Sequence, residues 1–452
     1  MKLNFVKNNL ISYLLIFLLI VNASISTISN YSFKSLLLKI FLSFILLVAL
    51  FIYSKQIQHP LKYVFRFDER LAAPFIILIL ILSYLTATVL YSSNAYFGLQ
   101  KIFNIVVSVI PIIFTAFYLI RNDILITLKA IVEISSAIII LLLVSILILK
   151  PFDHSTVYAF SPERWSHVFV GRLSSILSLV LLFAVLLQKD FKKIYFFLFV
   201  FGAGVYLTYL TGLRAAFLGL LFFSAVTVFV YYYFLNNSQI QKNNSIAKPS
   251  NKFIAILISA TLILTLLLTL ITPEGFQTGK RIENLTKIED LKFGGDPAIQ
   301  TRLISYKMSV GIFQAHPLFG SGFGGFNGYG NIEWTKDVKY PHNIVLELAC
   351  ELGLTGLFIF GVLFFMIFNS IYKMPPLDLE QSMPDLKKDI LLAQQIKIQR
   401  LVIFILFFFS IWLALFSKDL STQGTLWIFL IFIGEFKVIS SVIRFLKQKF
   451  HI

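Results

Sequence analysis

Residues 301–326 read TRLISYKMSVGIFQAHPLFGSGFGGF, and residues 340–356 read YPHNIVLELACELGLTG. They cover much of a polar interruption, Pro273 to His342, and the start of the apolar segment after it. Most of the remaining chain is apolar enough to lie in a membrane, so this loop is where charged groups can contact both water and a substrate. The sequence therefore predicts a membrane protein whose reactive groups gather around this loop.

The composition excludes a soluble globular protein. The chain is 58% hydrophobic and only 13% charged, whereas soluble domains carry about 25% charged residues. Its apolar residues form blocks of roughly 20, enough to cross a bilayer core of about 30 Å. Lipid offers backbone groups no partners, so such blocks must be helices. We expect an all-α integral membrane protein with about 12 transmembrane helices. We place them at 10–29, 34–54, 73–91, 102–120, 124–149, 168–187, 193–211, 214–234, 253–272, 344–369, 401–416 and 424–441.

The net charge of +17 does not indicate a nucleic-acid partner. The basic residues concentrate in alternate short loops, for example between Lys55 and Arg70, and the opposite loops are nearly empty of them. This is the positive-inside pattern, which predicts that both termini are cytoplasmic. Anionic membrane lipid is then the expected partner of the basic surface, and the 273–342 loop faces outward.

The organisation that we expect is one functional domain in three parts. Residues 1–272 carry transmembrane helices one to nine, 273–343 form the outer catalytic loop, and 344–452 carry helices ten to twelve and a cytoplasmic C-terminus. The first apolar block lacks a convincing cleavage site, so we interpret it as a retained span. Cys350 is the only cysteine, which excludes an intrachain disulfide and a cysteine-based metal site.

The outer loop contains a predicted helix and a glycine-rich turn. Pro297 suits a first helical turn with Asp296 as its cap, and the helix is expected to end at about Ala315, because His316 precedes a proline. Gly320, Gly322 and Gly324 follow. No strand precedes these glycines, so they are not a dinucleotide fingerprint. They favour tight turning or a close approach of the backbone to a ligand.

Four arginines are expected at the outer side of the membrane: Arg164, Arg172, Arg214 and Arg302. A charge inside the membrane costs at least about 2.5 kcal/mol and usually marks a paired or functional site. The alternative for these side chains is snorkelling to the lipid headgroups. Because guanidinium groups bind phosphate bidentately, the four together favour binding of a lipid-linked pyrophosphate.

His342 is the predicted general base, a role that histidine commonly takes near neutral pH. Arg302 and His316 belong to one helix and are about 21 Å apart at 1.5 Å per residue. We therefore assign His316 to shaping the loop, whereas His342 can fold back towards Arg302. The alternative for His342, which Asn343 follows, is a histidine that merely begins a helix. The outer acids are scattered and the first outer loop has none, which disfavours a metal-dependent mechanism.

The stretch RLISYKMSVGIFQAHPLFGSGFGGF, followed by PHNIVLELACELGLTGLFIF, resembles the signature region of the O-antigen ligase and polymerase superfamily. The specific match covers 302–361, and the Leu-Thr-Gly-x-Arg element at 210–214 extends a weaker resemblance. Two positions depart from the family pattern: Leu213 stands where a serine is common, and Tyr306 where a tryptophan is frequent. The upstream arginine motif is degenerate, which leaves Arg164 and Arg172 as alternatives.

This resemblance implies a polytopic inverting glycosyltransferase of the GT-C type in the bacterial inner membrane, independent of metal, ATP or other cofactors. The donor would be a glycan on undecaprenyl pyrophosphate, and the loop would be periplasmic. Position by position, Arg214 and Arg302 match the pyrophosphate-binding arginines and His342 matches the proposed base.

Three functions remain as hypotheses. The first is an O-antigen ligase that uses lipid A–core as acceptor, and the second is an O-antigen or exopolysaccharide polymerase with a glycan acceptor. The third is a transporter or flippase. Secondary transporters are built from repeats, usually two six-span halves joined on the cytoplasmic side. Here the large excursion follows the ninth span and faces outward, which argues against transport.

Overall fold

The computed structural model describes residues 13–23, 33–56, 69–122, 124–149, 167–188, 190–211, 213–236, 297–329, 340–373, 386–416, 420 and 423–430. Within these ranges the regular structure is entirely helical, with no strand, which confirms the all-α prediction. The predicted span at 253–272, the cap Asp296 and Arg164 lie outside the described residues.

Among the described helices, five are long and apolar enough to cross a membrane: Ala95–Ala116, Val168–Leu187, Phe191–Leu210, Arg214–Tyr231 and Ile344–Tyr372. Shorter apolar helices lie at Tyr13–Ala23, Leu37–Ile52, Ile76–Val89 and Arg400–Phe416. All of these helices overlap predicted spans, and together they describe a membrane protein.

The helix predicted to begin at residue 102 begins earlier. Asn94 accepts a hydrogen bond from the Phe97 N–H at 3.0 Å, and this cap starts α4 (Ala95–Asn104). A π-helical turn, η1 (Ile105–Val109), joins α4 to α5 (Ile110–Asn122). Hydropathy places the start seven residues late, because the Asn94 cap and not a change in hydropathy sets it.

The chain divides into two compact units, residues 1–127 with 297–452, and residues 128–296. The described helices of the second unit are α6 (Ile124–Leu149), α7 (His167–Leu187), α8 (Phe191–Leu210) and α9 (Arg214–Asn236). Helices α7 and α8 pack closely because Gly204 faces Ser178, and the hydroxyls of Ser174 and Thr208 lie 2.9 Å apart. Small residues and interhelical hydroxyl bonds are typical of helix pairs in membranes.

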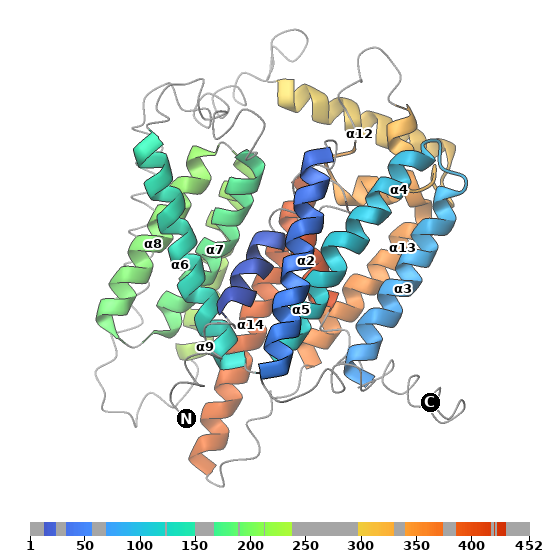
Figure 1. Cartoon of the computed structure of the whole chain (residues 1–452). Helices are drawn as coiled ribbons and strands as arrows, with labels where there is room; N and C mark the ends of the chain where they lie inside the picture. The colour runs from blue at the N-terminus through green and yellow to red at the C-terminus, as the bar shows by residue number, and fades with distance from the viewer. Residues whose placement is uncertain are drawn as a thin grey trace, which may run out of the picture. The chain divides into compact units, whose positions relative to one another are not determined.

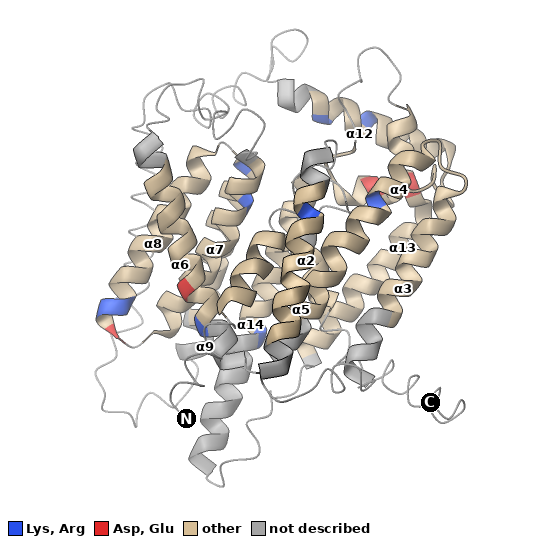
Figure 2. Cartoon of the chain, viewed as in Figure 1, with Lys and Arg blue, Asp and Glu red and all other residues tan. Residues whose placement is uncertain are grey.

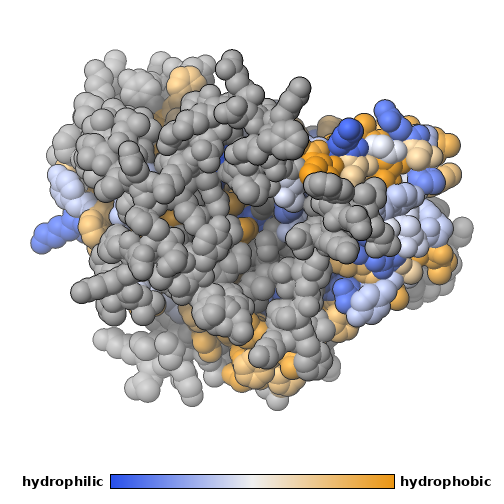
Figure 3. Space-filling view, turned by 90° about the horizontal axis from the view of Figure 1, so that it is seen from above, coloured by the Kyte–Doolittle hydropathy of each residue, from blue (hydrophilic) through white to orange (hydrophobic). Residues whose placement is uncertain are grey.

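The first unit holds the polar loop of interest. Its long helices are α2 (Phe33–Gln56), α3 (Glu69–Val89), α4 with η1 and α5, α13 (Ile344–Lys373) and α14 (Leu386–Phe416). Helix α12 (Pro297–Ala315) lies across the ends of several of them at the top of Figure 1. Hydrophilic and hydrophobic residues alternate on the described surface at this end, seen from above in Figure 3.

Helix α13 is interrupted at Gly353, where φ is 66° and ψ is −159°. The N–H groups after the break turn to the glycine-rich loop instead of to their own helix. Leu354 N–H donates to Pro317 O at 2.8 Å, and Thr355 N–H donates to Leu318 O at 3.1 Å. One turn earlier, both the N–H and the hydroxyl of Ser321 donate to Cys350 O. The loop is therefore hydrogen-bonded along the break.

The glycines of the loop approach other backbone segments. A Cβ at Gly324 would lie 2.3 Å from Gly98 N of α4, and one at Gly322 would lie 2.6 Å from Thr88 O of α3. A Cβ at Gly320 would lie 2.3 Å from the Glu351 carbonyl carbon of α13. The φ angles of the three loop glycines are 68°, 85° and 82° for Gly320, Gly322 and Gly324. The loop thus fits between α3, α4 and α13 only because these three positions carry no side chain.

A Gly324→Ala substitution tests this packing. Left-handed backbone and collision with α4 both oppose the new methyl, and we expect a loss of about 2–4 kcal/mol in stability. The measurement is thermal unfolding of the purified protein in detergent. Gly311→Ala is the control, since nothing lies within 4 Å of its added Cβ on α12, and alanine should stabilise that helix slightly. Equal unfolding temperatures for the two variants would contradict the packing.

Candidate functional site

Helix α12 has the bounds that the sequence predicts, Pro297–Ala315, and it carries Arg302 in a partly exposed position. Three residues later the buried Ser305 links this part of the helix to the segment before α13. Its hydroxyl lies 2.8 Å from Arg302 O and 3.1 Å from Pro341 O, so its proton is shared between them. The structure thereby brings the backbone at Arg302 close to the residue that precedes His342.

His342 has a left-handed backbone, with φ at 59°, which is uncommon for a residue other than glycine. Its imidazole is partly exposed and packs against Tyr340, with the ring centroids 4.4 Å apart. Asn343 caps α13, because its Oδ1 accepts from Val345 N–H at 2.9 Å and Leu346 N–H at 3.1 Å. His342 therefore sits just outside the first turn of α13, as the sequence indicates.

His316 occupies the other end of α12, where its backbone N–H still bonds to Ile312 O at 2.9 Å. Its carbonyl accepts from Gly320 N–H at 3.0 Å, and its Nε2 lies 3.0 Å from the Tyr329 hydroxyl. These contacts hold the two ends of the glycine-rich loop together. They agree with a loop-shaping role for His316.

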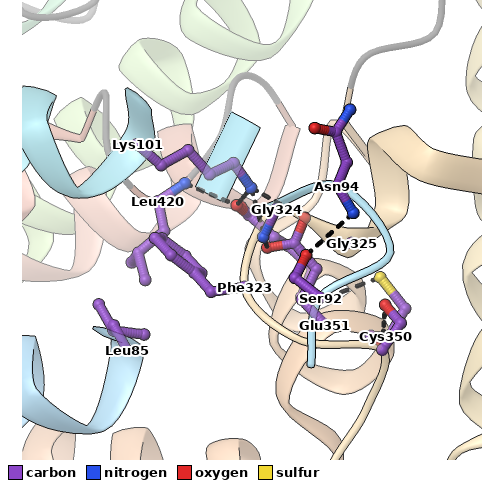
Figure 4. Close-up of polar contacts among 12 residues, drawn as sticks. Leu85, Ser92, Asn94, Lys101, Phe323, Gly324, Gly325, Cys350, Glu351 and Leu420 are labelled. Carbon is purple, nitrogen blue, oxygen red and sulfur yellow. Dashed lines mark hydrogen bonds and ion pairs between the residues drawn. The ribbon is translucent and has the colours of Figure 1, made fainter. Parts of the chain in front are cut away.

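Below the loop, a buried group of three charges joins α4 to α13. Lys101 Nζ lies 2.6 Å from Glu347 Oε1 and 2.9 Å from both carboxylate oxygens of Glu351. The Lys101 side chain is 2% exposed, and those of Glu347 and Glu351 are 2% and 0% exposed. Figure 2 shows how sparse charge is elsewhere along the described helices, and Figure 4 shows Lys101 and Glu351 of this group.

Each carboxylate also accepts a backbone N–H from a different segment. Glu351 Oε2 accepts from Gly324 in the glycine-rich loop at 2.9 Å, and Glu347 Oε2 accepts from Leu420 at 2.8 Å (Figure 4). The Lys101 ammonium also lies over the Phe323 ring, 4.9 Å from its centroid. Buried charges are tolerated when they are paired and hydrogen-bonded in this way.

Sequence reasoning missed Lys101, although a signal was present. Lys101 stands alone at the start of an apolar segment, and Glu347 and Glu351 are four residues apart on another. Residues spaced by four share a helix face, and opposite charges inside a membrane tend to pair. The pairing of 101 with 347 and 351 needed the three-dimensional structure, since it joins segments far apart in the chain.

The second unit holds two of the other predicted arginines. Arg214 is the first residue of α9 and is partly exposed, whereas Arg172 on α7 is 3% exposed. Their segments pack together: a Cβ at Gly171 would lie 2.6 Å from Thr211 Oγ1 and 3.0 Å from Leu213 Cβ. The residue before Arg172 therefore lies against the residues that lead into Arg214.

Residues 197–361 match the family model described as O-antigen ligase. The match ends at the residue where the predicted signature ends. The resemblance to the O-antigen ligase superfamily is confirmed. No curated protein matches the chain.

The O-antigen ligase match includes Arg214, Arg302 and His342, together with the whole glycine-rich loop and the break in α13. Arg164 and Arg172 precede it. The family assignment supports an enzyme of the ligase or polymerase type acting on glycans and lipid-linked substrates in general.

Ser305→Ala tests the link between α12 and the segment before α13 in this O-antigen ligase region. Losing the hydroxyl removes the donor to the buried Pro341 carbonyl, and we expect a cost of about 1–3 kcal/mol in thermal unfolding. Ser410→Ala is the matched control, because its buried hydroxyl donates to Leu406 O within its own helix, α14. A Ser410 variant as destabilised as the Ser305 variant would argue against a special role for this link.

Proposed function

We propose that this protein is an inverting glycosyltransferase of the O-antigen ligase type. It moves a glycan from undecaprenyl pyrophosphate to a sugar hydroxyl of lipid A–core at the periplasmic face, without a metal. The family match over 197–361 carries this proposal. The single hydroxyl bond that ties the Arg302 segment to the residue before His342 supports it geometrically.

The chemistry needs a base on one side of the anomeric carbon and anion ligands on the other. His342 takes the proton of the acceptor hydroxyl, whose oxygen forms the new bond to the anomeric carbon. The bond from that carbon to the pyrophosphate oxygen breaks in line, and its electron pair leaves with the pyrophosphate. Arg302 neutralises the charge that develops there, where electrostatic stabilisation is most effective.

Arg214 is the second proposed pyrophosphate ligand, and Arg172 or Arg164 the third. For Arg172 the support is its burial and the packing of its segment against the residues before Arg214. A buried guanidinium needs an anion or several hydrogen-bond acceptors.

The proposal includes a GT-C-type arrangement of about 12 spans, with both termini cytoplasmic and the inner membrane as location.

The lipopolysaccharide of a deletion strain would distinguish a ligase from a polymerase. Lipid-linked polymer without long-chain lipopolysaccharide supports the ligase, and core that carries single repeat units supports the polymerase.

His342→Ala should lower the rate of glycan transfer about 10²–10⁴-fold, the usual contribution of a positioned general base. The assay is transfer from a defined undecaprenyl pyrophosphate glycan to lipid A–core with metal chelated. His316→Ala is the comparison and should lose much less, since it is assigned to shaping the loop. A correctly inserted His342 variant with wild-type rates would refute the catalytic assignment.

Arg302→Lys should weaken donor binding about tenfold while the charge is kept, because an ammonium cannot bind phosphate bidentately. Titration with a non-transferable pyrophosphate analogue measures this directly. Lys307→Gln is the matched control: it removes a positive charge from an exposed position of the same helix, and it should leave donor affinity unchanged. Equal affinity of the Arg302 variant and the wild type would show that Arg302 is not a pyrophosphate ligand.

A further inference from the structure

Lys101 is the one positive partner shared by two buried carboxylates in the described part of the chain. It lies in α4, within a helix apolar enough to cross a membrane, and it approaches Glu347 and Glu351 within hydrogen-bonding distance. Two carboxylates and one ammonium leave a net charge of −1. Two negative charges this close repel each other, and the ammonium between them offsets that repulsion.

The carboxylate oxygens also hold the surrounding backbone. Glu351 binds the N–H of Gly324, and that glycine is already in backbone contact with Gly98 of α4. Glu347 binds the N–H of Leu420. Lys101 therefore joins α4 to α13 through its three contacts with carboxylate oxygens, and the two carboxylates extend this link to the glycine-rich loop and to residue 420.

His342 is connected to Glu347 through Asn343. Glu347 lies in the first turn of α13, and its backbone N–H donates to Asn343 O at 2.9 Å. Asn343 is both the cap of α13 and the neighbour of His342. A rotation or shift of the first turn of α13 would move the imidazole too, since Asn343 is the only residue between His342 and the start of the helix.

We propose that Lys101 is a positioning residue for glycan transfer: it clamps Glu347 and Glu351 so that the first turn of α13 and the glycine-rich loop hold His342 in register. This inference rests on the proposed function. Lys101 touches no substrate in it, and it acts only through the two carboxylates. A displacement of the catalytic group by about 1 Å can cost on the order of 10²-fold in rate. A small displacement of His342 is therefore enough to lower the rate of transfer.

The experiment compares Lys101→Met, Lys101→Arg and the double variant Lys101→Met with Glu347→Gln. Lys101→Met leaves a net charge of −2, whereas the double variant restores −1 without restoring the clamp. We expect at least a tenfold fall in kcat for Lys101→Met, with the KM for the donor changed by less than threefold. Lys101→Arg should recover most of kcat. All rates are normalised to folded, monodisperse protein in detergent.

The double variant decides between positioning and simple charge balance. If Lys101 positions His342, the double variant regains part of the thermal stability that Lys101→Met loses but keeps the low kcat. If Lys101 only balances charge, stability and kcat recover together, and the proposal is overturned. This comparison remains decisive where Lys101→Met alone does not insert. A Lys101→Met enzyme with wild-type kcat would also overturn it.

Failure of the proposed function would look different. In that case the wild type itself transfers no glycan from the polyprenyl pyrophosphate donor, while the unfolding temperatures of the variants still differ. An active wild type with unaffected Lys101 variants would count against the positioning role alone.

Discussion

A backbone N–H that has lost its helical acceptor must find another one where water is excluded. The break of α13 at Gly353 creates this requirement, and the carbonyls of Pro317 and Leu318 meet it. The glycine-rich loop therefore lies along α13, which begins just after His342. Gly322 and Gly324 are needed in it because α3 and α4 leave no room for a Cβ at these two positions. The position of the glycine-rich loop against α13 depends on this replacement of helical hydrogen bonds by bonds to the loop.

The same exchange gives a physical reason for the two halves of the sequence signature. The His-Pro-Leu-x-Gly-x-Gly stretch supplies the carbonyls of Pro317 and Leu318, and the Glu-Leu-Gly-x-x-Gly stretch supplies the freed N–H groups after Gly353. Glu351 adds a third link through Gly324. Residues 27 to 37 positions apart thus form one structural unit, and each half needs the other.

Much of this was accessible from the sequence. Hydropathy predicted the helical membrane fold, Pro297 and His316-Pro317 marked both ends of α12, and Pro341-His342-Asn343 marked the start of α13. These features depend on local rules. The early start of α4 was missed because an asparagine cap, not hydropathy, sets it. The Lys101 clamp and the Ser305 link were missed because they join distant segments, and one sequence contains no information about such pairs beyond charge and spacing. Arg172 was predicted as a site residue, but neither its burial nor the packing of Gly171 against the segment before Arg214 follows from local rules.

The left-handed backbone of His342 has a consequence for how stability and chemistry compete at this position. Only glycine adopts such a φ without a steric penalty, and strained non-glycine residues of this kind cost on the order of 1–3 kcal/mol. A glycine at 342 would remove the backbone strain and also the imidazole, so the residue with the lowest conformational cost at this position has no catalytic group. Substitutions chosen to stabilise the protein should therefore leave this residue unchanged, because the strained backbone and the reactive side chain belong to the same residue.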